Sequence, residues 1–318
     1  MTAASGAPTL GIDLGGTNLR IGVVDAAGAI LAEVREPAPS EIDALVRAIG
    51  GQADELIPAH GVSAVGVGTA GMIDGDGAVR YAPNLPMFVD VPLRALLAER
   101  IATPLMVEND ANAAAWGEYS HGAARGTSHT LVITLGTGVG GGVIVDGRLF
   151  RGAHGFAGEV GHWQFDPHGP QCACGESGHW EAVASGTALG RLARAWAEEG
   201  RAPGVLARAG GDAAAVRGEH AGESAAAGEA DGVAILGEYT EVVALGFAGL
   251  ANILDPELIV VSGGLVELGD VLLDPLRAAF LGHLEGSEHR PPVPIVAAEL
   301  GDASGMVGAA ALARDLVA

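Results

Sequence analysis

The stretch that decides the fold is Thr9–Asp25, TLGIDLGGTNLRIGVVD. Its two apolar runs, interrupted by the pair Gly15-Gly16, predict a strand, a tight turn and a second strand. The same order returns at 130–145, TLVITLGTGVGGGVIV. Each predicted turn carries a threonine among its glycines, Thr17 and Thr137. The repeat predicts two related halves that face one cleft.

Strands and helices are expected to alternate along the rest of the chain, which indicates an α/β fold. The first three strands would form an antiparallel meander. Residues 200–232, rich in alanine, glycine and charge, are expected to form a mobile helical tip or loop. The expected strands are 9–14, 19–25, 29–34, 62–68, 105–108, 130–135, 142–145 (after a glycine turn at 136–142), 258–261 and 293–297, and the expected helices are 41–57, 93–101, 110–119, 240–254 and 306–317.

The second informative stretch is 158–181, GEVGHWQFDPHGPQCACGESGHWE, which holds both cysteines of the chain. The spacing of four side chains in it is that of a tetrahedral zinc site with two sulfur and two nitrogen ligands: His162, Cys172, Cys174 and His179. Two ordinary buried thiols are the first alternative. A disulfide is the second, but across a Cys-x-Cys step it would be badly strained. We therefore favour a metal.

Length and composition exclude several classes of protein. The chain has 318 residues, enough for about two domains, and a formal net charge of −22. All 17 basic side chains are arginine, which excludes mechanisms that need a lysine, and the acidic balance argues against a nucleic-acid partner. No uninterrupted apolar run reaches the ~18 residues of a membrane span, and no signal-peptide pattern is present. We expect a soluble, cytoplasmic protein without a membrane partner.

The glycine turns suggest a site for nucleotide phosphates. The first turn lies between two strands, and so it differs from a Rossmann fingerprint or a P-loop. Its glycines let backbone amides approach a phosphate, Thr17 offers a hydroxyl, and Asp13 can hold a hydrated magnesium ion. Hairpins also need such glycines, which keeps the evidence weak for any one turn. The residues expected to bind the phosphates and magnesium are Asp13, Gly15, Gly16, Thr17, Asn18, Thr137 and Gly138.

Four motifs carry a resemblance to a known family: Asp13–Thr17, Glu108-Asn109-Asp110, Gly158–His162 and the cysteine segment. With all four in family order over nearly the whole chain, the sequence resembles the ROK family of bacterial sugar kinases and sugar-responsive repressors. The resemblance implies an α/β, two-lobed actin/hexokinase-like (ribonuclease H-like) fold with duplicated glycine-turn halves and a small zinc knuckle. It further implies a small lobe over 1–112 plus the C-terminal helix 303–318, and a large lobe over 113–302 with the knuckle and dimerisation elements.

Within that family the sequence most resembles the bacterial ATP-dependent glucokinases. This implies transfer of the γ-phosphoryl group of ATP to the 6-hydroxyl of glucose, with Mg-ATP and a structural zinc ion bound. Another ROK hexose kinase, acting on fructose, mannose, allose, N-acetylglucosamine or N-acetylmannosamine, is the alternative. A non-catalytic sugar sensor is less favoured, because about a dozen residues precede Asp13 and a winged-helix domain needs ~60. The family also implies a homodimer or homotetramer.

The resemblance assigns Asp110 as the catalytic base, which accepts the proton of the attacking hydroxyl. Aspartate is also a favoured helix cap, and both roles are compatible. Gly263 and Gly264 resemble the turn on the adenosine side. Arg20 is expected to point to solvent. The residues that match sugar-binding positions of the family are Gly71, Asn84, Asn109, Asp110, Glu159, His162 and Glu181.

The zinc segment departs from the family pattern at one position. The family has a third cysteine where this chain has His179. Because histidine is a competent zinc ligand, we predict a Cys2His2 site. His162 would place one ring nitrogen on zinc and the other towards the sugar, so that the metal organises the pocket. His168 is a spare ligand that we expect to be solvated, and a capping or solvated role is the alternative for Glu181.

Overall fold

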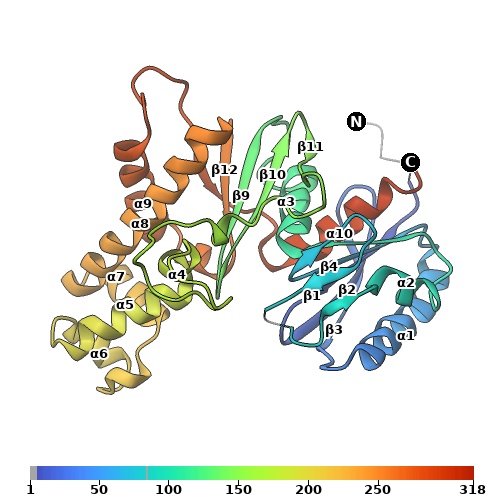
Figure 1. Ribbon diagram of the computed structural model, residues 1–318, viewed down its shortest axis with the longest axis horizontal. Coiled ribbons are helices and arrows are strands. Elements are labelled where there is room, and N and C mark those ends of the chain that lie inside the picture. Colours follow the sequence, from blue (N-terminus) through green and yellow to red (C-terminus); the bar gives the residue numbers. More distant parts are fainter. Residues whose placement is uncertain (1–5, 84) are drawn as a thin grey trace. The chain divides into compact units, whose positions relative to one another are not determined.

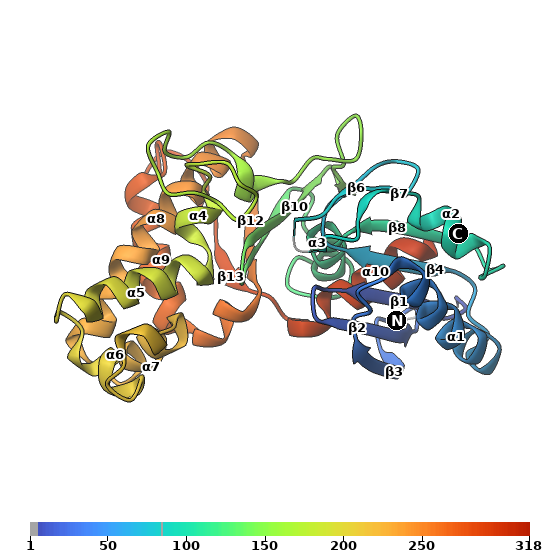
Figure 2. The same ribbon diagram turned by 60° about the horizontal axis from the view of Figure 1, so that its bottom comes forward.

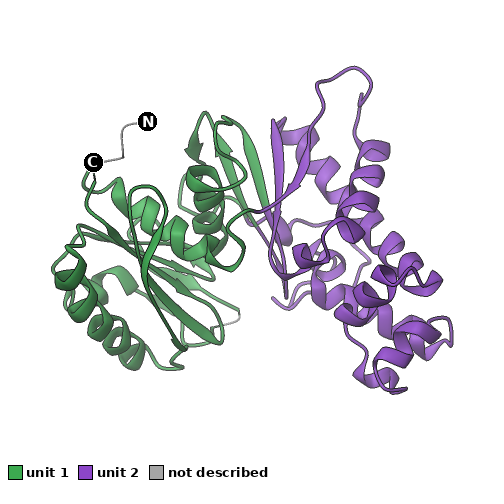
Figure 3. Ribbon diagram, turned by 180° about the vertical axis from the view of Figure 1, so that it is seen from behind, with its two compact units in different colours: residues 1–132, 141–158, 299–318 green, residues 133–140, 159–298 purple. Residues whose placement is uncertain are grey.

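The structure is a computed structural model, and it describes residues 6–83 and 85–318. The chain divides into two compact units. Unit 1 comprises Met1–Val132, Gly141–Gly158 and Glu299–Ala318, and unit 2 comprises Ile133–Gly140 and Glu159–Ala298 (Figure 3).

Unit 1 is built on a five-stranded sheet. The elements of this layer are β1 (Thr9–Leu14), β2 (Asn18–Val24), β3 (Ile30–Pro37), α1 (Ile42–His60), β4 (Val65–Thr69), α2 (Leu93–Ala98), β8 (Leu105–Asn109), α3 (Asp110–His121) and α10 (Ser304–Arg314). The strand order is β3-β2-β1-β4-β8; the first three pair antiparallel, which confirms the predicted meander, and β4 and β8 join in parallel. Helices α1 and α2 lie over one face of the sheet, and α3 and α10 over the other (Figures 1 and 2).

The alternation of side chains along β1 decides which face each residue serves. Leu10 and Ile12 are completely buried in the core that the sheet forms with α1. Gly11, which lies between them, faces α10 and allows a close approach, since a Cβ atom there would stand 2.0 Å from the carbonyl oxygen of Met306. Asp13 follows on the same face, so that its carboxylate lies against the start of α10.

The predicted boundary between residues 112 and 113 falls inside α3. The whole of α3 lies in unit 1, because it packs along α10 at small residues of both helices. A Cβ atom on Gly117 would lie 2.5 Å from the carbonyl oxygen of Ser304, and one on Gly308 would lie 1.7 Å from that of Ala113. This tight helix pair links the C-terminal segment to the helix that begins at Asp110.

Unit 1 also contains a small sheet that the sequence did not reveal. Its strands are β5 (Met72–Ile73), β6 (Val79–Tyr81) and β7 (Val89–Val91), in the order β5-β6-β7. Strands of two or three residues are too short to display a period-two pattern.

The second five-stranded sheet has the order β11-β10-β9-β12-β13. Its strands are β9 (Thr130–Leu135), β10 (Val139–Val145), β11 (Arg148–Leu149), β12 (Leu258–Ser262) and β13 (Ile295–Ala297). Residues 136–142 were expected to form a turn. This is wrong for residues 139–142, because β10 begins at Val139. The glycines inside β10 serve close packing instead: a Cβ atom on Gly142 would stand 2.3 Å from the Cβ atom of Ala115 in α3.

Helices dominate unit 2. They are α4 (Glu181–Ala184), α5 (Gly186–Glu198), α6 (Pro203–Arg208), α7 (Gly218–Ala226), α8 (Ala230–Leu254) and α9 (Asp270–His283), with 3₁₀ turns η1 (Val160–His162), η2 (Ala213–Ala215) and η3 (Gly264–Leu268). Trp180, completely buried, packs edge-to-face on Phe247 of α8 with ring centroids 6.0 Å apart. Its indole nitrogen donates to the carbonyl oxygen of Val242 at 3.3 Å. Trp180 therefore anchors the cysteine segment to α8 directly before Glu181.

Residues 200–232 are more ordered than their composition suggested. They form α6, η2, α7 and the first residues of α8. The carboxylate of Asp231 accepts hydrogen bonds from the N–H groups of Gly204 and Val205, at 2.7 and 3.2 Å, and thus caps α6 from α8. The helical part of the prediction is confirmed.

By length and mean hydropathy, α8 is long and apolar enough to cross a membrane. No uninterrupted apolar run marks this helix in the sequence, because Glu238 and Glu241 divide the apolar residues. In the structure, 56% of its apolar window is buried inside the protein, and residues such as Tyr239 and Phe247 form the core of unit 2. This is the environment of a core helix.

Glu118 of α3 is a buried carboxylate that holds three backbone N–H groups. It accepts from Ala123 at 2.8 Å, from Glu299 at 3.0 Å and from Leu300 at 2.9 Å. We expect the substitution Glu118→Gln to lower the free energy of unfolding by about 2 kcal/mol or more, because an amide group has one acceptor oxygen and leaves a buried donor unpaired. Urea unfolding measures this. Glu198→Gln, on the exposed side of α5, is the control and should change the value by less than about 0.5 kcal/mol; equal effects of the two substitutions would refute the argument.

Candidate active site and metal centre

The turn between β1 and β2 presents its residues to solvent. Gly16, Thr17 and Asn18 are exposed. The Gly15 N–H donates to the carbonyl oxygen of Asn18 at 3.0 Å, and the Asn18 amide donates to the Thr17 hydroxyl at 3.1 Å. A closed glycine turn with an exposed hydroxyl can receive the oxygens of a phosphate group.

Asp13, near the end of β1, lies in an environment that disfavours a negative charge. Burial, reinforced by the nearby Asp110 carboxylate, raises the pKa of Asp13 from 3.8 to about 6, and Arg20 offsets part of the effect. The start of α10 lies beside it, where a Cβ atom on Gly305 would stand 3.0 Å from the carboxylate. Asp13 is thus a carboxylate whose charged form is disfavoured by burial and by a second carboxylate, Asp110, and a divalent cation would stabilise this pair.

The expectation that Arg20 points to solvent was wrong. Its side chain is 11% exposed and its Nε atom lies 2.7 Å from Glu33 on the neighbouring strand β3. A second guanidinium nitrogen donates to the carbonyl oxygen of Asp302. Side-chain alternation along β2 could not reveal these acceptors, because one comes from another strand and the other from the far end of the chain.

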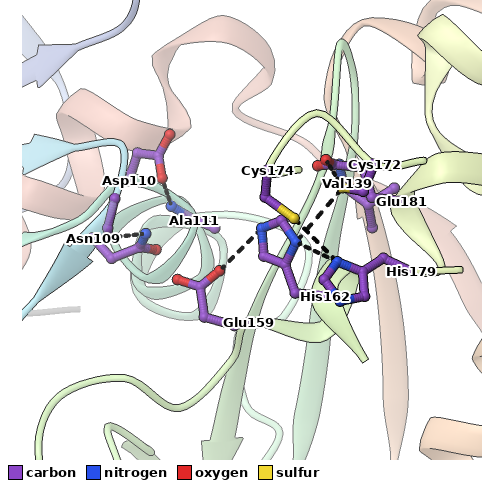
Figure 4. A network of polar contacts seen from close by, with 12 residues as sticks. Asn109, Asp110, Ala111, Val139, Glu159, His162, Cys172, Cys174, His179 and Glu181 are labelled. Atoms are coloured by element: carbon purple, nitrogen blue, oxygen red, sulfur yellow. Dashed lines mark hydrogen bonds and ion pairs between the residues drawn. The ribbon is translucent and has the colours of Figure 1, made fainter. Parts of the chain in front are cut away.

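The start of α3 joins two of the predicted site residues. Asn109 is the N-cap, since its side-chain oxygen accepts from the N–H of Asn112 at 3.0 Å. Asp110 is the first helical residue, and its Oδ1 atom accepts from the N–H of Ala111 at 2.9 Å (Figure 4). The capping role weighed for Asp110 thus belongs to Asn109. Asp110 remains partly exposed, while burial raises the pKa of its carboxyl and the Ala111 N–H offsets part of that effect.

Gly71 lies beside Asn109. The Asn109 side-chain amide donates to the carbonyl oxygen of Gly71 at 3.1 Å, which joins the loop after β4 to the end of β8. Asn84, also expected to contact the sugar, lies outside the described residues.

In unit 2, the turn between β9 and β10 rests on the start of α5. The carbonyl oxygen of Gly136 accepts from the N–H of Gly186 at 2.7 Å, and that of Thr137 accepts from the Thr187 hydroxyl at 2.7 Å. Thr137 itself is exposed. Gly263, which follows the neighbouring strand β12, packs on the end of β9, since a Cβ atom there would lie 2.5 Å from the carbonyl oxygen of Leu135. Unit 2 therefore gathers the second and third glycine turns at one place.

The four predicted metal ligands meet in unit 2. Their ligand atoms all lie within 4.8 Å of one another: His162, Cys172, Cys174 and His179. The two Nδ1 atoms are 3.3 Å apart, Cys174 Sγ lies 3.3 Å from His179 Nδ1, and Cys172 Sγ lies 3.9 Å from His162 Nδ1 (Figure 4). Both cysteines are free thiols. In a tetrahedral zinc site with bonds of about 2.0–2.3 Å, ligand atoms stand about 3.3–3.8 Å apart. The donor set therefore fits a zinc ion, with His179 in place of the third cysteine.

The spare histidine His168 is exposed and does not join this group, as expected.

The two glutamates that flank the metal ligands differ in their surroundings. Glu159 is 38% exposed, and its Oε2 atom lies 3.9 Å from Nε2 of His162 (Figure 4). Because Nδ1 of His162 faces the metal ligands, Nε2 is the nitrogen that faces Glu159. Glu181 starts α4, where Oε2 accepts from the N–H of Val139 at 2.9 Å and Oε1 accepts from Cys172 Sγ at 3.1 Å. Glu181 thus links the metal ligands to the β9–β10 turn.

One pair near the site was not found from the sequence. Glu108, just before Asn109, is 6% exposed at its side chain and forms an ion pair with Arg151 at 2.6 Å. Glu108 belongs to the motif Glu108-Asn109-Asp110, but the sequence gives neither Glu108 nor Arg151 a role of its own. The available signal was that a carboxylate at the end of a buried strand needs a cation as partner, although the sequence does not say which one.

Comparison with known proteins places the chain in a family. The model of the ROK family matches residues 9–316. The chain is 41% identical to a glucokinase of Streptomyces coelicolor, over 96% of this chain and 98% of the relative. It is 35% identical to a glucokinase of Thermotoga maritima, over 97% and 98%. The crystal structure of a ROK family glucokinase from Streptomyces griseus in complex with glucose and AMPPNP superposes with a TM-score of 0.86, at 41% identity, over 97% of this chain and all of that one. The fold that the resemblance implied is confirmed, and the chain belongs to the ROK family.

Proposed function

We propose that this protein is an ATP-dependent hexose kinase and that its substrate is glucose. The observation that carries the proposal is the arrangement at the start of α3, where Asp110 combines a raised pKa with partial exposure directly after the cap Asn109. Full-length similarity to glucokinases of two bacteria supports the same activity. Phosphoryl transfer to a sugar hydroxyl needs a positioned carboxylate near the attacking oxygen.

In the proposed reaction, Asp110 orients the 6-hydroxyl of glucose and accepts its proton as the hydroxyl oxygen attacks the γ-phosphorus atom of ATP. A base of raised pKa holds that proton better than an ordinary aspartate does. The amide of Asn109, already aligned by Gly71 and Asn112, is placed to bind a neighbouring hydroxyl. We assign Glu159, His162 and Glu181 to further sugar hydroxyls, as the family resemblance implies.

The phosphates of ATP are assigned to the turn at Gly15–Asn18 and to Thr137-Gly138, with Gly263 and Gly264 on the adenosine side. Magnesium bound with ATP neutralises charge on the transferred phosphoryl group. The residue of this chain that would hold its hydration shell is Asp13, whose pKa is raised by burial and by the Asp110 carboxylate. The fold holds this negative charge in position before the nucleotide binds, so the magnesium site would need little rearrangement.

The metal ligands serve the sugar through His162. If Nδ1 of His162 held a zinc ion, Nε2 would carry the ring proton, and Nε2 is the nitrogen that faces Glu159, so that His162 would orient that carboxylate. In this proposal the four ligands would hold zinc in a structural role, and His162 and His179 would fix the loop that contains Glu159 and leads to Glu181.

The substitution Cys174→Ser tests this role. We expect bound zinc to fall from roughly one ion per chain to a trace, because three donors remain, and the KM for sugar to rise about tenfold or more. The KM for ATP should stay within about twofold. Metal analysis and steady-state kinetics measure these quantities. His168→Ala removes an exposed histidine of the same loop and should change neither; retention of zinc by the Cys174→Ser protein would contradict the assigned ligand set.

The experiment that tests the function is a coupled assay with Mg-ATP and glucose, mannose, fructose, allose, N-acetylglucosamine and N-acetylmannosamine. Turnover with glucose well above the others supports the proposal. Preference for another sugar would keep the reaction and change the substrate. Binding of a sugar without turnover would favour a sugar sensor. Assembly as a homodimer or homotetramer stays a prediction of the family resemblance.

A further inference from the structure

Glu108 is a fully satisfied buried carboxylate at the entrance to α3. Its Oε1 atom accepts from the N–H of Asn109 at 3.0 Å and from the side-chain amide of Asn112 at 3.1 Å. Its Oε2 atom accepts from Nε of Arg151 at 2.6 Å. A buried carboxylate is costly unless it is paired with a cation and hydrogen-bonded. The Arg151 guanidinium therefore compensates this buried carboxylate, which holds both asparagines.

Arg151 reaches this place from a different part of unit 1. It follows β11 and opens the loop 150–158, which leads to Glu159. Within the loop, the N–H of Ala157 donates to the carbonyl oxygen of Arg151 at 3.1 Å. The end of the loop meets the same asparagine, because a Cβ atom on Gly158 would stand 3.4 Å from Oδ1 of Asn112. That oxygen is buried and has no hydrogen-bond partner among the described residues.

The ion pair thus ties together two segments that the proposed reaction depends on. One is the end of β8, whose next residues are Asn109 and Asp110. The other is the loop that precedes Glu159. A displacement of a reacting group by about 1 Å lowers a rate by about 100-fold, so a contact that fixes these segments has a direct consequence for turnover.

We propose that Arg151 and Glu108 are positioning residues for phosphoryl transfer, which set the orientation of Asn109 and Asp110 and of the loop 150–158. The inference rests on the proposed function. It differs from a merely structural role because it predicts a selective effect on the sugar and on the chemical step, with binding of ATP spared.

The test compares Arg151→Met, Arg151→Lys, Glu108→Gln and the double variant Arg151→Met/Glu108→Gln. For Arg151→Met we expect the KM for sugar to rise about tenfold and kcat to fall about tenfold, with the KM for ATP within about twofold. Lysine should restore part of both losses, since it returns the charge without the Nε geometry. The double variant should have the same kcat and the same KM for sugar as Arg151→Met, because both substitutions remove the same contact between Arg151 and Glu108.

Arg125→Met is the matched control. Arg125 forms an exposed ion pair with Glu299 at 3.1 Å in the same unit, and its loss should change every kinetic value by less than about twofold. A lowered Tm for Arg151→Met together with wild-type kcat and sugar KM would show that the pair is only structural and would overturn the proposal. Multiplicative losses from the two single substitutions would also overturn it.

Failure of the proposed function has a different signature. It is visible in the wild type alone, as absence of turnover with every hexose of the panel. In that event the variants are compared by their affinity for sugar without ATP, measured by calorimetry. The positioning role requires Arg151→Met to bind sugar more weakly than Arg125→Met does. If Arg151→Met does not fold, Arg151→Lys and Glu108→Gln provide the comparison, and sugar affinities equal to that of the wild type contradict the proposal.

Discussion

Replacing Asp110 by asparagine is expected to lower kcat about 1,000-fold while the affinity for sugar stays within about threefold. Asparagine has nearly the same shape and keeps an oxygen that can accept from the N–H of Ala111, so the start of α3 should be preserved. It cannot accept a proton from the attacking hydroxyl. The loss should therefore appear in the chemical step, and not in ground-state binding.

Steady-state kinetics and calorimetric titration with glucose measure the two quantities separately. Asp315→Asn, an exposed aspartate at the end of unit 1, is the control and should leave both unchanged. Near-normal turnover of Asp110→Asn would show that another group accepts the proton. A parallel loss of sugar affinity would point to a misfolded helix start, which Asn109 and its cap contact make unexpected.

Replacing Asp13 by asparagine is expected to stabilise the metal-free fold and to abolish most activity. The folded-state pKa of Asp13, about 6, lies above its ordinary value of 3.8. Between these values the folded chain binds more protons at this site than the unfolded chain does, and the free energy of unfolding therefore falls as the pH rises. Above pH 6 the charged carboxylate costs up to about 3 kcal/mol, which asparagine removes.

Urea unfolding of Asp13→Asn and wild type, without magnesium, measures this effect. We expect the variant to be more stable at pH 7.5, and the difference to shrink towards pH 4, where wild-type Asp13 is protonated. Turnover with Mg-ATP should fall about 100-fold or more, because the carboxylate assigned to the hydrated magnesium ion is gone. A variant that is less stable than the wild type at pH 7.5 would refute the electrostatic argument.

The two predictions concern carboxylates that lower the stability of the fold and that the proposed reaction needs. Asp13 and Asp110 are nearby carboxylates, and burial together with the charge of Asp110 disfavours the charged form of Asp13 in the metal-free protein. Retaining both has a cost in stability that a purely structural site would not require, and perturbed carboxylates of this kind gather at functional sites. The buried Glu118, in contrast, has each oxygen occupied by backbone N–H groups and serves the fold.

Much of the fold followed from patterns between neighbours in the chain. The strand over 9–14 and the strand over 130–135 were predicted with the bounds that the structure has. The helix expected over 110–119 is α3, which continues to His121. The metal ligands could also be found, because donor types and their spacing are local properties of one segment.

The ion-pair partners of the charged side chains could not be predicted from local sequence patterns. Arg20 was expected in solvent, yet it pairs with Glu33 and with the backbone at Asp302. Arg151 pairs with Glu108 across a long separation in sequence. Each carboxylate had many possible arginines, and nothing in the spacing of residues distinguishes them.

The sequence by itself determined the alternation of strands and helices, the glycine turns, the four side chains that cluster as candidate metal ligands, and the family. Tertiary structure alone decided that α10 returns to cover Asp13, that Asn109 caps α3 ahead of Asp110, and that Arg151 neutralises Glu108. The physical reason is the range of the forces involved. Turn geometry and side-chain periodicity act between residues a few positions apart, whereas a buried charge is stabilised by whichever opposite charge the packed chain brings within a few ångströms.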